Sequence, residues 1–515
     1  SSNSSYTRKN QFSQGLNLDI AQGKIGSYTS YKYDHSDGWQ NSHLTEDGED
    51  IIETIAPLSL GYSSNNFSQK FTYDATDQLS FYANGGYYNR GLERPVERED
   101  ITGGSKYNTT YEGYNWGAGA KYKLSKRNVI QFDYSGNNYA SRYKYLIENS
   151  GYLPGQYALT KLQKFHDAEL KGIFGFTTNS TTVFGVDYRR EVLRRPDSDL
   201  DKSVYTASAY GQHEVKLWNH LTGVVGVRYD HHEQTGGRFT PKVAAMYNIG
   251  NFNVRATYAA GFRAPGIDEL YYHMFKKTMG ARATISLGDE NLDPERSNYY
   301  SINMEYRTNR FSASVTGYLN YVKNMVTSKS TKFDDLPEAE QNQLREEFPE
   351  IGDLSSTKNL SVKNYFNFEK ATVKGFEVNL NGNLFPGFTL AGNYTYAYGR
   401  GLNEGGEWQN IERSIRHTAT ITGNYTHSWS DYTLNLGRLQ SKVYYPGDAD
   451  GNAPGYGIWN LNTRHTFDGF RNFVIEPGIG IDNIFNKKDN RPLNKNFALY
   501  SPGRSVVISL ALRLK

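Results

Sequence analysis

Polar and apolar residues alternate strictly in segment after segment of this chain. In the run 116–124 the even-numbered residues are apolar, and they are Trp116, Ala118, Ala120, Tyr122 and Leu124. The last segment repeats the pattern with Val506, Ile508, Leu510, Leu512 and Leu514. A repeat of two is the period of a β-strand whose two faces meet different surroundings. Segments of this kind number about twenty, which predicts one large all-β fold.

The composition narrows the class of protein. The 515 residues include 42 Tyr, 26 Phe and no Cys, and the net charge is +3. No stretch approaches the roughly 20 apolar residues of a transmembrane helix. The absence of Cys excludes disulfides and cysteine metal sites. The near balance of charge gives no reason to expect nucleic acid as a partner.

The polar faces of these strands carry Arg, Lys and Asn, as a water-filled interior allows, so we expect a transmembrane antiparallel β-barrel. A closed sheet also leaves no unpaired edge. Four residues are expected to face lipid: Trp116, Ile421, Leu510 and Leu512. Three are expected to face the lumen: Arg416, Thr420 and Lys121. Alternation also suits a soluble all-β protein, but connections that alternate between short and long favour the barrel.

A strand count refines this prediction. Ten strands are expected from residue 253 onward: 253–262, 298–307, 311–325, 364–384, 388–399, 414–429, 432–444, 457–467, 473–486 and 504–515. Eleven precede them, starting near Tyr6, so about 21 strands are visible. Because single-chain bacterial barrels have even strand numbers, we expect a full barrel of about 22 strands with one strand before residue 1. Barrels of that size are plugged transporters rather than open pores.

Two local features complete the expected fold. The outward parity slips between Val373 and Phe376, so Gly375 is predicted to be a bulge or a site of close approach. In the longest loop, Asp335 as N-cap, Pro337 and Glu338 predict a short surface helix.

Several segments together resemble the barrel portion of the TonB-dependent outer-membrane receptors. They are TPKVAAMYNIGNFNVRATYAAGFRAPGIDELYY (240–272), GDENLDPERSNYYSINMEY (288–306), FEKATVKGFEVNL (368–380), IDNIFNKKDNRP (481–492) and YSPGRSVVISL (500–510). The resemblance implies a non-enzymatic receptor in the bacterial outer membrane that moves a scarce nutrient inward. It implies contact with outer-membrane lipid, an inner-membrane energy-transducing complex as partner, and room for a surface lipoprotein.

The N-terminal plug of that family has no counterpart in the sequence. We therefore expect residues 1–515 to form only the transmembrane barrel domain, with the plug and the first strand missing. The partner complex would then engage the missing N-terminal region.

Within the family, the stretch Phe262-Arg263-Ala264-Pro265 resembles the haem receptors, in which a histidine of the same loop binds the haem iron. His273 lies in the corresponding interval, beside Tyr271 and Tyr272. Imidazole suits iron, and aromatic rings offer flat apolar area to a porphyrin. The resemblance thus implies haem as ligand, with His273 as its metal ligand and Tyr271, Tyr272 and Arg263 as further candidates.

Other ligands and other roles stay open. The second loop motif reads Asn291-Leu292-Asp293-Pro294-Glu295, which departs from the order in the haem receptors. Similar stretches occur in receptors for ferric siderophores and cobalamin. His273 also fits a solvated loop histidine, and Tyr271 and Tyr272 fit rim aromatics at the membrane interface. Arg263 also fits a residue that fixes the base of the loop through carbonyl groups.

Other functions are less well supported. Asp448, Asp450 and Asn452 begin like a calcium loop, but Ala453 and Trp459 stand where its glycine and glutamate belong, so we expect an acidic turn. The sequence has neither a Gly-x-Ser-x-Gly nor a His-Glu-x-x-His motif. We therefore expect no enzyme and no intrinsic cofactor. A passive porin is the remaining alternative.

Overall fold

The computed structural model describes residues 2–7, 11–38, 45–46, 49–50, 61–93, 106–149, 151–277, 283–402, 406–411, 414–441, 443–444, 452–453, 455–487 and 503–515. Within these ranges, 25 strands form one sheet. Three of them, β16, β17 and β22, attach beyond one end of the ring. The remaining 22 strands pair antiparallel in chain order and close on themselves. The predicted antiparallel barrel is confirmed.

The ring strands are β1 (Ser2–Thr7), β2 (Gln11–Gln22), β3 (Ile25–Ser36), β6 (Gly61–Asp74), β7 (Leu79–Glu93), β8 (Tyr107–Lys123), β9 (Asn128–Tyr145), β10 (Tyr157–Thr177), β11 (Ser180–Arg195), β12 (Leu200–Leu217), β13 (Leu221–His232), β14 (Gly236–Ile249), β15 (Phe252–Arg263), β18 (Glu295–Arg307), β19 (Phe311–Lys332), β20 (Leu360–Phe385), β21 (Phe388–Leu402), β23 (His417–His427), β24 (Ser430–Gln440), β27 (Tyr456–His465), β28 (Phe473–Asp482) and β29 (Ser505–Leu514). The elements outside the ring are β4 (Thr45–Glu46), β5 (Glu49–Asp50), η1 (Pro196–Ser198), α1 (Ile267–Tyr271), β16 (His273–Lys277), β17 (Ala283–Leu287), η2 (Phe333–Asp335), α2 (Glu338–Glu347), η3 (Pro349–Asp353), β22 (Trp408–Asn410), β25 (Val443–Tyr444) and β26 (Asn452–Ala453).

The short strand β1 closes the ring. Ser2 lies opposite Leu16 of β2 on one side and Leu512 of β29 on the other. The count of 21 visible strands was therefore one too low, and the strand expected before residue 1 is not needed for closure. Only three residues separate β1 from β2, so the alternation continues and the sequence reads as one strand. All ten strands predicted from residue 253 onward are confirmed.

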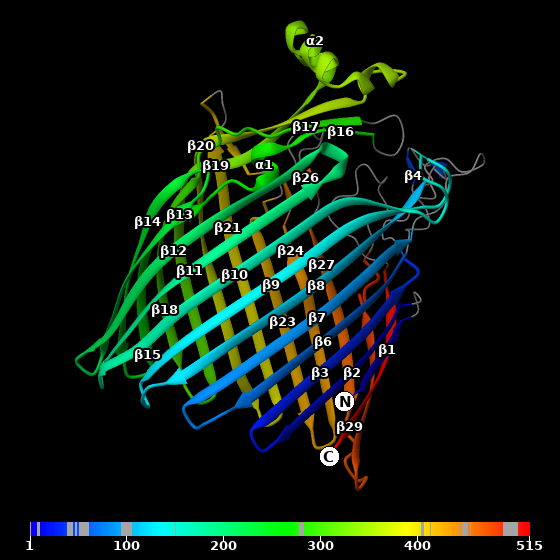
Figure 1. Cartoon of the computed structure of the whole chain (residues 1–515). Coiled ribbons are helices and arrows are strands. Elements are labelled where there is room, and N and C mark those ends of the chain that lie inside the picture. Colours follow the sequence, from blue (N-terminus) through cyan, green and yellow to red (C-terminus); the bar gives the residue numbers. More distant parts are fainter. Residues whose placement is uncertain are drawn as a thin grey trace.

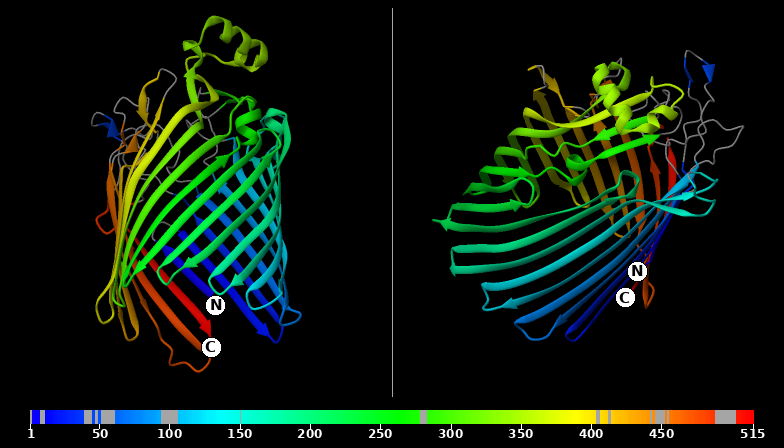
Figure 2. Two further views of the ribbon diagram at one scale, coloured as in Figure 1. Left: turned by 90° about the vertical axis from the view of Figure 1, so that its left-hand side faces the viewer. Right: turned by 45° about the horizontal axis from the view of Figure 1, so that its top comes forward.

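Short turns gather at one end of the barrel and long connections at the other (Figures 1 and 2). The chain ends marked N and C lie next to each other toward the short-turn end (Figure 2). At the long-loop end, α2 stands above the ring (Figure 1). Among the described residues, no helix is long and apolar enough to cross a membrane.

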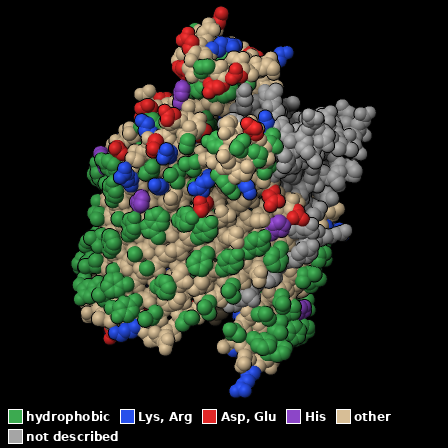
Figure 3. All heavy atoms as spheres, turned by 45° about the vertical axis from the view of Figure 1, so that its right-hand side comes forward, with side chains coloured by type: hydrophobic (Ala, Val, Ile, Leu, Met, Phe, Trp, Pro, Cys, Tyr) green, Lys and Arg blue, Asp and Glu red, His purple; other side chains and the backbone are tan. Residues whose placement is uncertain are grey.

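Hydrophobic side chains cover the outer wall of the barrel (Figure 3). Trp116, Ile421, Leu510 and Leu512 belong to this surface and are 37% to 44% exposed. Lys121 and Thr420 occupy alternate positions on β8 and β23, so they face the lumen as expected. Arg416 precedes β23 and lies over the ring of Tyr398 at 4.6 Å, so strand alternation does not place it.

The two local predictions are modified by the structure. Gly375 is paired without a register shift, so it is not a bulge. It is a site of close approach, because a Cβ there would lie 2.0 Å from the carbonyl oxygen of Tyr396. The predicted surface helix is α2, but Asp335 belongs to η2 and the N-cap of α2 is Pro337.

Candidate functional site

Two long loops fold together above the ring, and we call this assembly the cap. It consists of β16, β17, η2, α2, η3 and the first residues of β20. β17 pairs in parallel with β20, with Ala283 opposite Leu360 and Leu287 opposite Asn364. Loop 264–294 is thereby tied to the first residues of β20, which begins 66 residues after Pro294, at Leu360.

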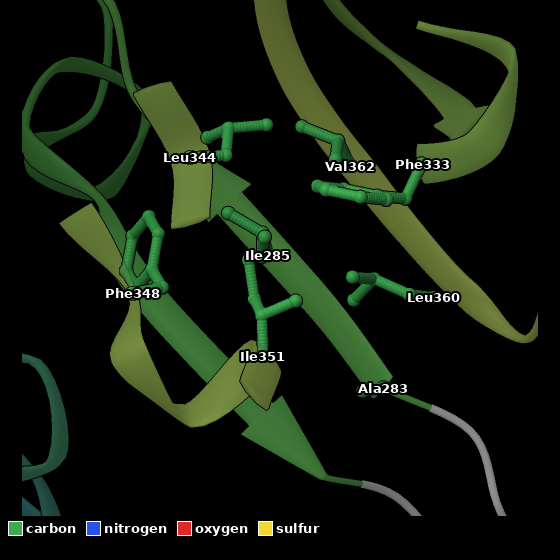
Figure 4. Close-up of a cluster of buried hydrophobic side chains, with 8 residues drawn as sticks. All are labelled: Ala283, Ile285, Phe333, Leu344, Phe348, Ile351, Leu360 and Val362. Carbon is green, nitrogen blue, oxygen red and sulfur yellow. The ribbon is translucent and has the colours of Figure 1, made fainter. Parts of the chain in front are cut away.

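A small hydrophobic core holds the cap together (Figure 4). It contains Ala283, Ile285, Phe333, Leu344, Phe348, Ile351, Leu360 and Val362. Phe333, Ile285 and Val362 are fully buried. Burial of a large apolar side chain stabilises by about 1.5–3 kcal/mol, so this core can order loops that have few backbone pairings of their own.

Arg263 ends β15 and joins the base of the cap through two carboxylates. Its Nη2 donates to Glu295 Oε1 at 2.6 Å, and its Nη1 donates to Glu269 Oε2 at 3.0 Å. Glu269 also accepts from the backbone N–H of Gly266 at the start of α1, at 2.7 Å. Arg263 therefore fixes the loop base as one interpretation expected, but through carboxylates rather than carbonyl groups.

The second loop motif has structural contacts as well. Leu292 is 5% exposed, and Pro294 is buried beside it. Asn291 donates to Asp289 Oδ1 through its backbone N–H at 2.8 Å. Glu295 Oε1 also accepts from the backbone N–H of Val326 at 2.8 Å. The motif thus links the start of β18 to α1 and β19.

Tyr271 and Tyr272 belong to a group that we call the cation–tyrosine cluster. Its members are Arg195, Lys202, Tyr271, Tyr272, Lys363 and Tyr365. The Arg195 guanidinium lies over the ring of Tyr272 at 5.1 Å, and its Nη1 donates to the phenolic oxygen of Tyr272. The ammonium of Lys202 lies over the ring of Tyr271 at 4.8 Å. Positive charges from three chain segments therefore meet aromatic rings at the long-loop end.

The third pair of the cluster comes from β20. The ammonium of Lys363 lies 4.8 Å from the ring centre of Tyr365 and donates to its hydroxyl at 3.1 Å. The ring centres of Tyr365 and Tyr272 are 6.4 Å apart. Arg195 and Lys363 are thus linked through two neighbouring tyrosines.

Buried apolar residues hold the tyrosines in position. One group contains Leu193, Leu200, Val204 and Ile267, and both Tyr271 and Tyr272 pack against it. Burial raises the pKa of Tyr272, although the nearby Arg195 acts in the opposite direction. Burial also raises the pKa of Tyr271, with a smaller effect from the Glu290 carboxylate. Both phenols are therefore neutral at physiological pH.

His273 joins the two loops of the cap. Its ring lies on the ring of Phe348 with 4.5 Å between centres, and its Nε2 is 3.5 Å from Glu347 Oε2. The side chain is 56% exposed. No group of three or more metal-ligating side chains occurs within the described residues. Of the calcium candidates, Asp448 and Asp450 lie outside the described residues, and Asn452 and Ala453 form β26.

The loop residues predicted from the sequence thus separate into three places. Arg263, Pro294 and Glu295 lie at the base of the cap, Tyr271 and Tyr272 lie in the cation–tyrosine cluster, and His273 lies on the cap itself. Phe262 is half-buried on β15, and Pro265 is buried just beyond it. Sequence reasoning missed Arg195, Lys202, Lys363 and Tyr365.

A family model described as "TonB dependent receptor-like, beta-barrel" matches residues 38–484. The ferric enterobactin receptor PirA of Pseudomonas aeruginosa is 25% identical over 317 residues, which cover 55% of this chain and 38% of that protein. The vitamin B12 transporter BtuB of Vibrio cholerae is 21% identical over 286 residues, covering 53% of this chain and 41% of that protein.

The chain therefore spans about two fifths of the length of the curated relatives it matches. Among solved structures, the ferric enterobactin receptor PfeA of Pseudomonas aeruginosa superposes with a TM-score of 0.74 at 15% identity. That match covers 100% of this chain and 79% of the other. At this identity the similarity establishes the barrel fold.

Proposed function

Because this chain belongs to the TonB-dependent receptor β-barrel family, we propose that it is the barrel of an energy-coupled receptor that imports a ferric siderophore. The protein is located in the outer membrane. The short-turn end then faces the periplasm and the long loops face outward. The cap and the cation–tyrosine cluster stand where a ligand arrives from outside the cell.

The cation–tyrosine cluster is the observation that carries the choice of ligand. Lys202 and Lys363 each place an ammonium over a tyrosine ring, whereas the charge of Arg195 is met by Asp197 at 3.2 Å. Such a surface suits an anionic iron chelate with flat ligand groups, because cations neutralise its charge and the tyrosines offer aromatic faces. The similar receptors named for ferric enterobactin support the same class of ligand.

We propose a ferric siderophore in place of haem, the ligand expected from the sequence. The relatives described above are named for a ferric siderophore and for vitamin B12. His273, the expected haem ligand, contacts Phe348 and lies near Glu347, so its position is explained by the joining of the two loops. Cobalamin is the second candidate, supported by the similarity to BtuB.

Energy coupling requires parts beyond the barrel. We propose that the functional receptor contains a plug and engages a TonB-type inner-membrane complex through it, as the resemblance implies. Intact-mass measurement of the mature protein from native membranes tests the plug. Single-channel conductance separates the proposal from the porin alternative, because a plugged receptor conducts far less than an open barrel.

Uptake of radioactive iron by cells that carry the full receptor and lack other siderophore receptors tests the proposed ligand. We expect iron uptake from anionic ferric siderophores and none from haem, and cyanocobalamin labelled with radioactive cobalt should not enter the same cells. Lys202→Gln with Lys363→Gln should weaken siderophore binding at least about tenfold, because loss of even one contact to a charged group costs about 1.5–3 kcal/mol.

The matched control removes two positive charges from the long-loop end outside the cluster. Lys332→Gln with Lys358→Gln serves this purpose, since both residues are exposed. The control should bind like the wild type. Transport of cobalamin and of no siderophore would show that cobalamin, the second candidate, is the imported ligand. Equal loss of binding in both double variants would show that the cation–tyrosine cluster is not the ligand-binding site.

A further inference from the structure

One strand, β20, connects the cap with the short-turn end of the barrel (Figure 1). Its register with β19 is unbroken, so alternate residues keep to one face along its whole length. Lys363 and Tyr365 of the cation–tyrosine cluster share this face with Asn379, far below them. The face is the lumen side, since Leu380 on the other face belongs to the apolar outer wall and is 47% exposed. One strand face therefore leads from the cluster down into the barrel.

Two tyrosines lie along this face between the cluster and Asn379. Tyr318 of β19 is opposite Gly375 of β20, and its ring stacks on that of Tyr299 with 6.5 Å between centres. A Cβ on Gly375 would lie 2.7 Å from the phenolic oxygen of Tyr318. The missing side chain thus leaves room for the Tyr318 ring against the wall. These rings continue the aromatic surface of the cluster toward the short-turn end.

Below the tyrosine pair, the lumen wall carries amides and hydroxyls. Ser314, Asn379, Asn393 and Thr420 lie opposite one another on four neighbouring strands, and we call them the amide row. Asn393 Nδ2 donates to Asn379 Oδ1 at 2.6 Å, and Asn379 Nδ2 donates to Ser314 Oγ at 3.5 Å. A hollow of about 390 Å³ lies along the row. The row therefore borders open space inside the barrel.

This hollow has no net charge. Of the described residues that line it, only Glu305 and Arg307 are charged, and they pair with each other at 2.6 Å. Amides and hydroxyls can replace water around a polar solute through hydrogen bonds of modest net strength. A charged solute in the hollow is therefore neither repelled nor held tightly.

Another sector of the lumen wall is acidic. Asp133, Glu169 and Asp187 lie opposite one another on β9, β10 and β11, where the alternate residues are exposed apolar side chains of the outer wall. Lys171 lies 2.8 Å from Glu169, and Arg228 lies 2.7 Å from Asp187. These two cations do not balance the three carboxylates. An anionic solute is repelled by this sector, so the neutral sector is the easier way through.

We propose that the lumen face of β20, the tyrosine pair and the amide row form the route along which an anionic iron chelate crosses the barrel. This route rests on the import function proposed above. The cluster captures the chelate by charge, and the tyrosine rings contact its flat groups on the way down. Hydrogen bonds between neutral groups are about half as strong as those to charged groups. The amide row can therefore release the chelate toward the short-turn end.

The test uses single thiols, because the chain contains no Cys. The route variant is Asn393→Cys and the control is Asn84→Cys. Both asparagines are half-buried on the lumen face, and each lies five residues after the start of a strand that leaves a short turn, Phe388 of β21 and Leu79 of β7. Cells carrying the full receptor react with a bulky uncharged maleimide. Binding and energy-dependent uptake of radioactive ferric enterobactin are then measured.

Modified Asn393→Cys should bind ferric enterobactin like the wild type but lose most of its uptake, because the bulky group fills the hollow. Modified Asn84→Cys should keep both binding and uptake. A charge tests the same route without bulk. Asn393→Asp should slow uptake about fivefold, the factor that corresponds to two like charges 4 Å apart in water, whereas Asn84→Asp should leave uptake unchanged.

Equal losses of uptake in the two modified thiol variants, or no loss in either, would overturn the route. If the wild type imports haem or cobalamin instead, the proposed ligand fails, and the two modified variants are compared with that solute. A loss confined to Asn393→Cys then supports the route. If none of the three enters, a small impermeant thiol reagent outside energised cells gives the answer. Faster reaction at Asn393→Cys than at Asn84→Cys supports the route, and equal or slower reaction overturns it.

Discussion

Arg263 Nη2 and Glu295 Oε1, which are 2.6 Å apart, connect the end of β15 to the start of β18. These two residues border the loop 264–294, so their ion pair closes its base. Glu295 also accepts from the Val326 backbone, and Arg263 also reaches Glu269 of α1. One pair therefore positions three chain segments beneath the cap.

Arg263→Ala should loosen loop 264–294 without disturbing the barrel. We expect a loss of about 1 kcal/mol in docking of the loop, because the arginine is 46% exposed and water screens its charge. Hydrogen–deuterium exchange should rise in 264–294. The exchange of this loop in Arg263→Lys should lie between that of the wild type and that of Arg263→Ala, since an ammonium cannot span both carboxylates. Unchanged exchange in Arg263→Ala would show that other contacts suffice.

Gly288→Ala should displace α1. A Cβ at residue 288 would lie 2.6 Å from the carbonyl carbon of Leu270 and 2.7 Å from the backbone nitrogen of Tyr271. These backbone atoms cannot move aside as the end of a flexible side chain can. We therefore expect the substitution to destabilise the packing of α1 by about 1–3 kcal/mol. The control is Gly352→Ala in η3, where nothing lies within 4 Å of the new Cβ. Limited proteolysis of the folded barrel should cut the cap faster only in Gly288→Ala.

Phe333→Ala should open the cap core. Phe333 is fully buried among Ile285, Leu360 and other members of that core. Removal of a buried Phe side chain costs about 3–5 kcal/mol. This loss is a large share of the stabilisation that a core of this size can provide to the cap. Exchange in α2 and η3 should approach that of an unstructured loop. Leu153→Ala, at a residue 54% exposed, is the control and should leave exchange unchanged.

The barrel was predictable because its signal is local and repeated. Each strand carries its own alternation, so an error on one strand does not displace the others. The error at β1 affected only the count: the odd total of 21, taken with the parity rule, predicted one more strand before residue 1. Three residues between β1 and β2 do not interrupt the period, and two strands were read as one.

The cap and the cation–tyrosine cluster were not predictable in the same way. Tyr272 meets Arg195 across 77 residues, and β17 pairs with β20 across a similar span. Neither contact produces a repeating pattern in the sequence from which it could be predicted. The resemblance pointed to His273 and the tyrosines as residues of one loop, but only the folded chain separates the cap from the cluster.

Spin labels at Ile421 and Thr420 should report opposite sides of the wall. Ile421 is 43% exposed on the apolar face, and Thr420 is its neighbour on the other face. In lipid vesicles, a lipid-soluble quencher should reach the label at Ile421 far better than the label at Thr420. A water-soluble quencher should show the reverse order. Equal accessibility at both positions would contradict a membrane-spanning wall at β23.

Docking of the cation–tyrosine cluster should weaken at alkaline pH. Burial raises the pKa of Tyr272 above its ordinary value of 10.0, with Arg195 opposing the shift only in part. The folded state therefore holds the phenolic proton more tightly than the unfolded loop does. The resulting stabilisation is fully present below about pH 10 and is lost as pH rises through the folded pKa.

Tyr272→Phe removes this titration and measures it by difference. We expect the tyrosinate absorbance of the wild type minus that of Tyr272→Phe to rise with a midpoint above 10.0, the ordinary tyrosine value. Loop 264–294 of the wild type should also become protease-sensitive over the same pH range, whereas that of Tyr272→Phe should change less. A midpoint at or below 10.0 would mean that the phenol is hydrated rather than buried against Arg195 and Ile267.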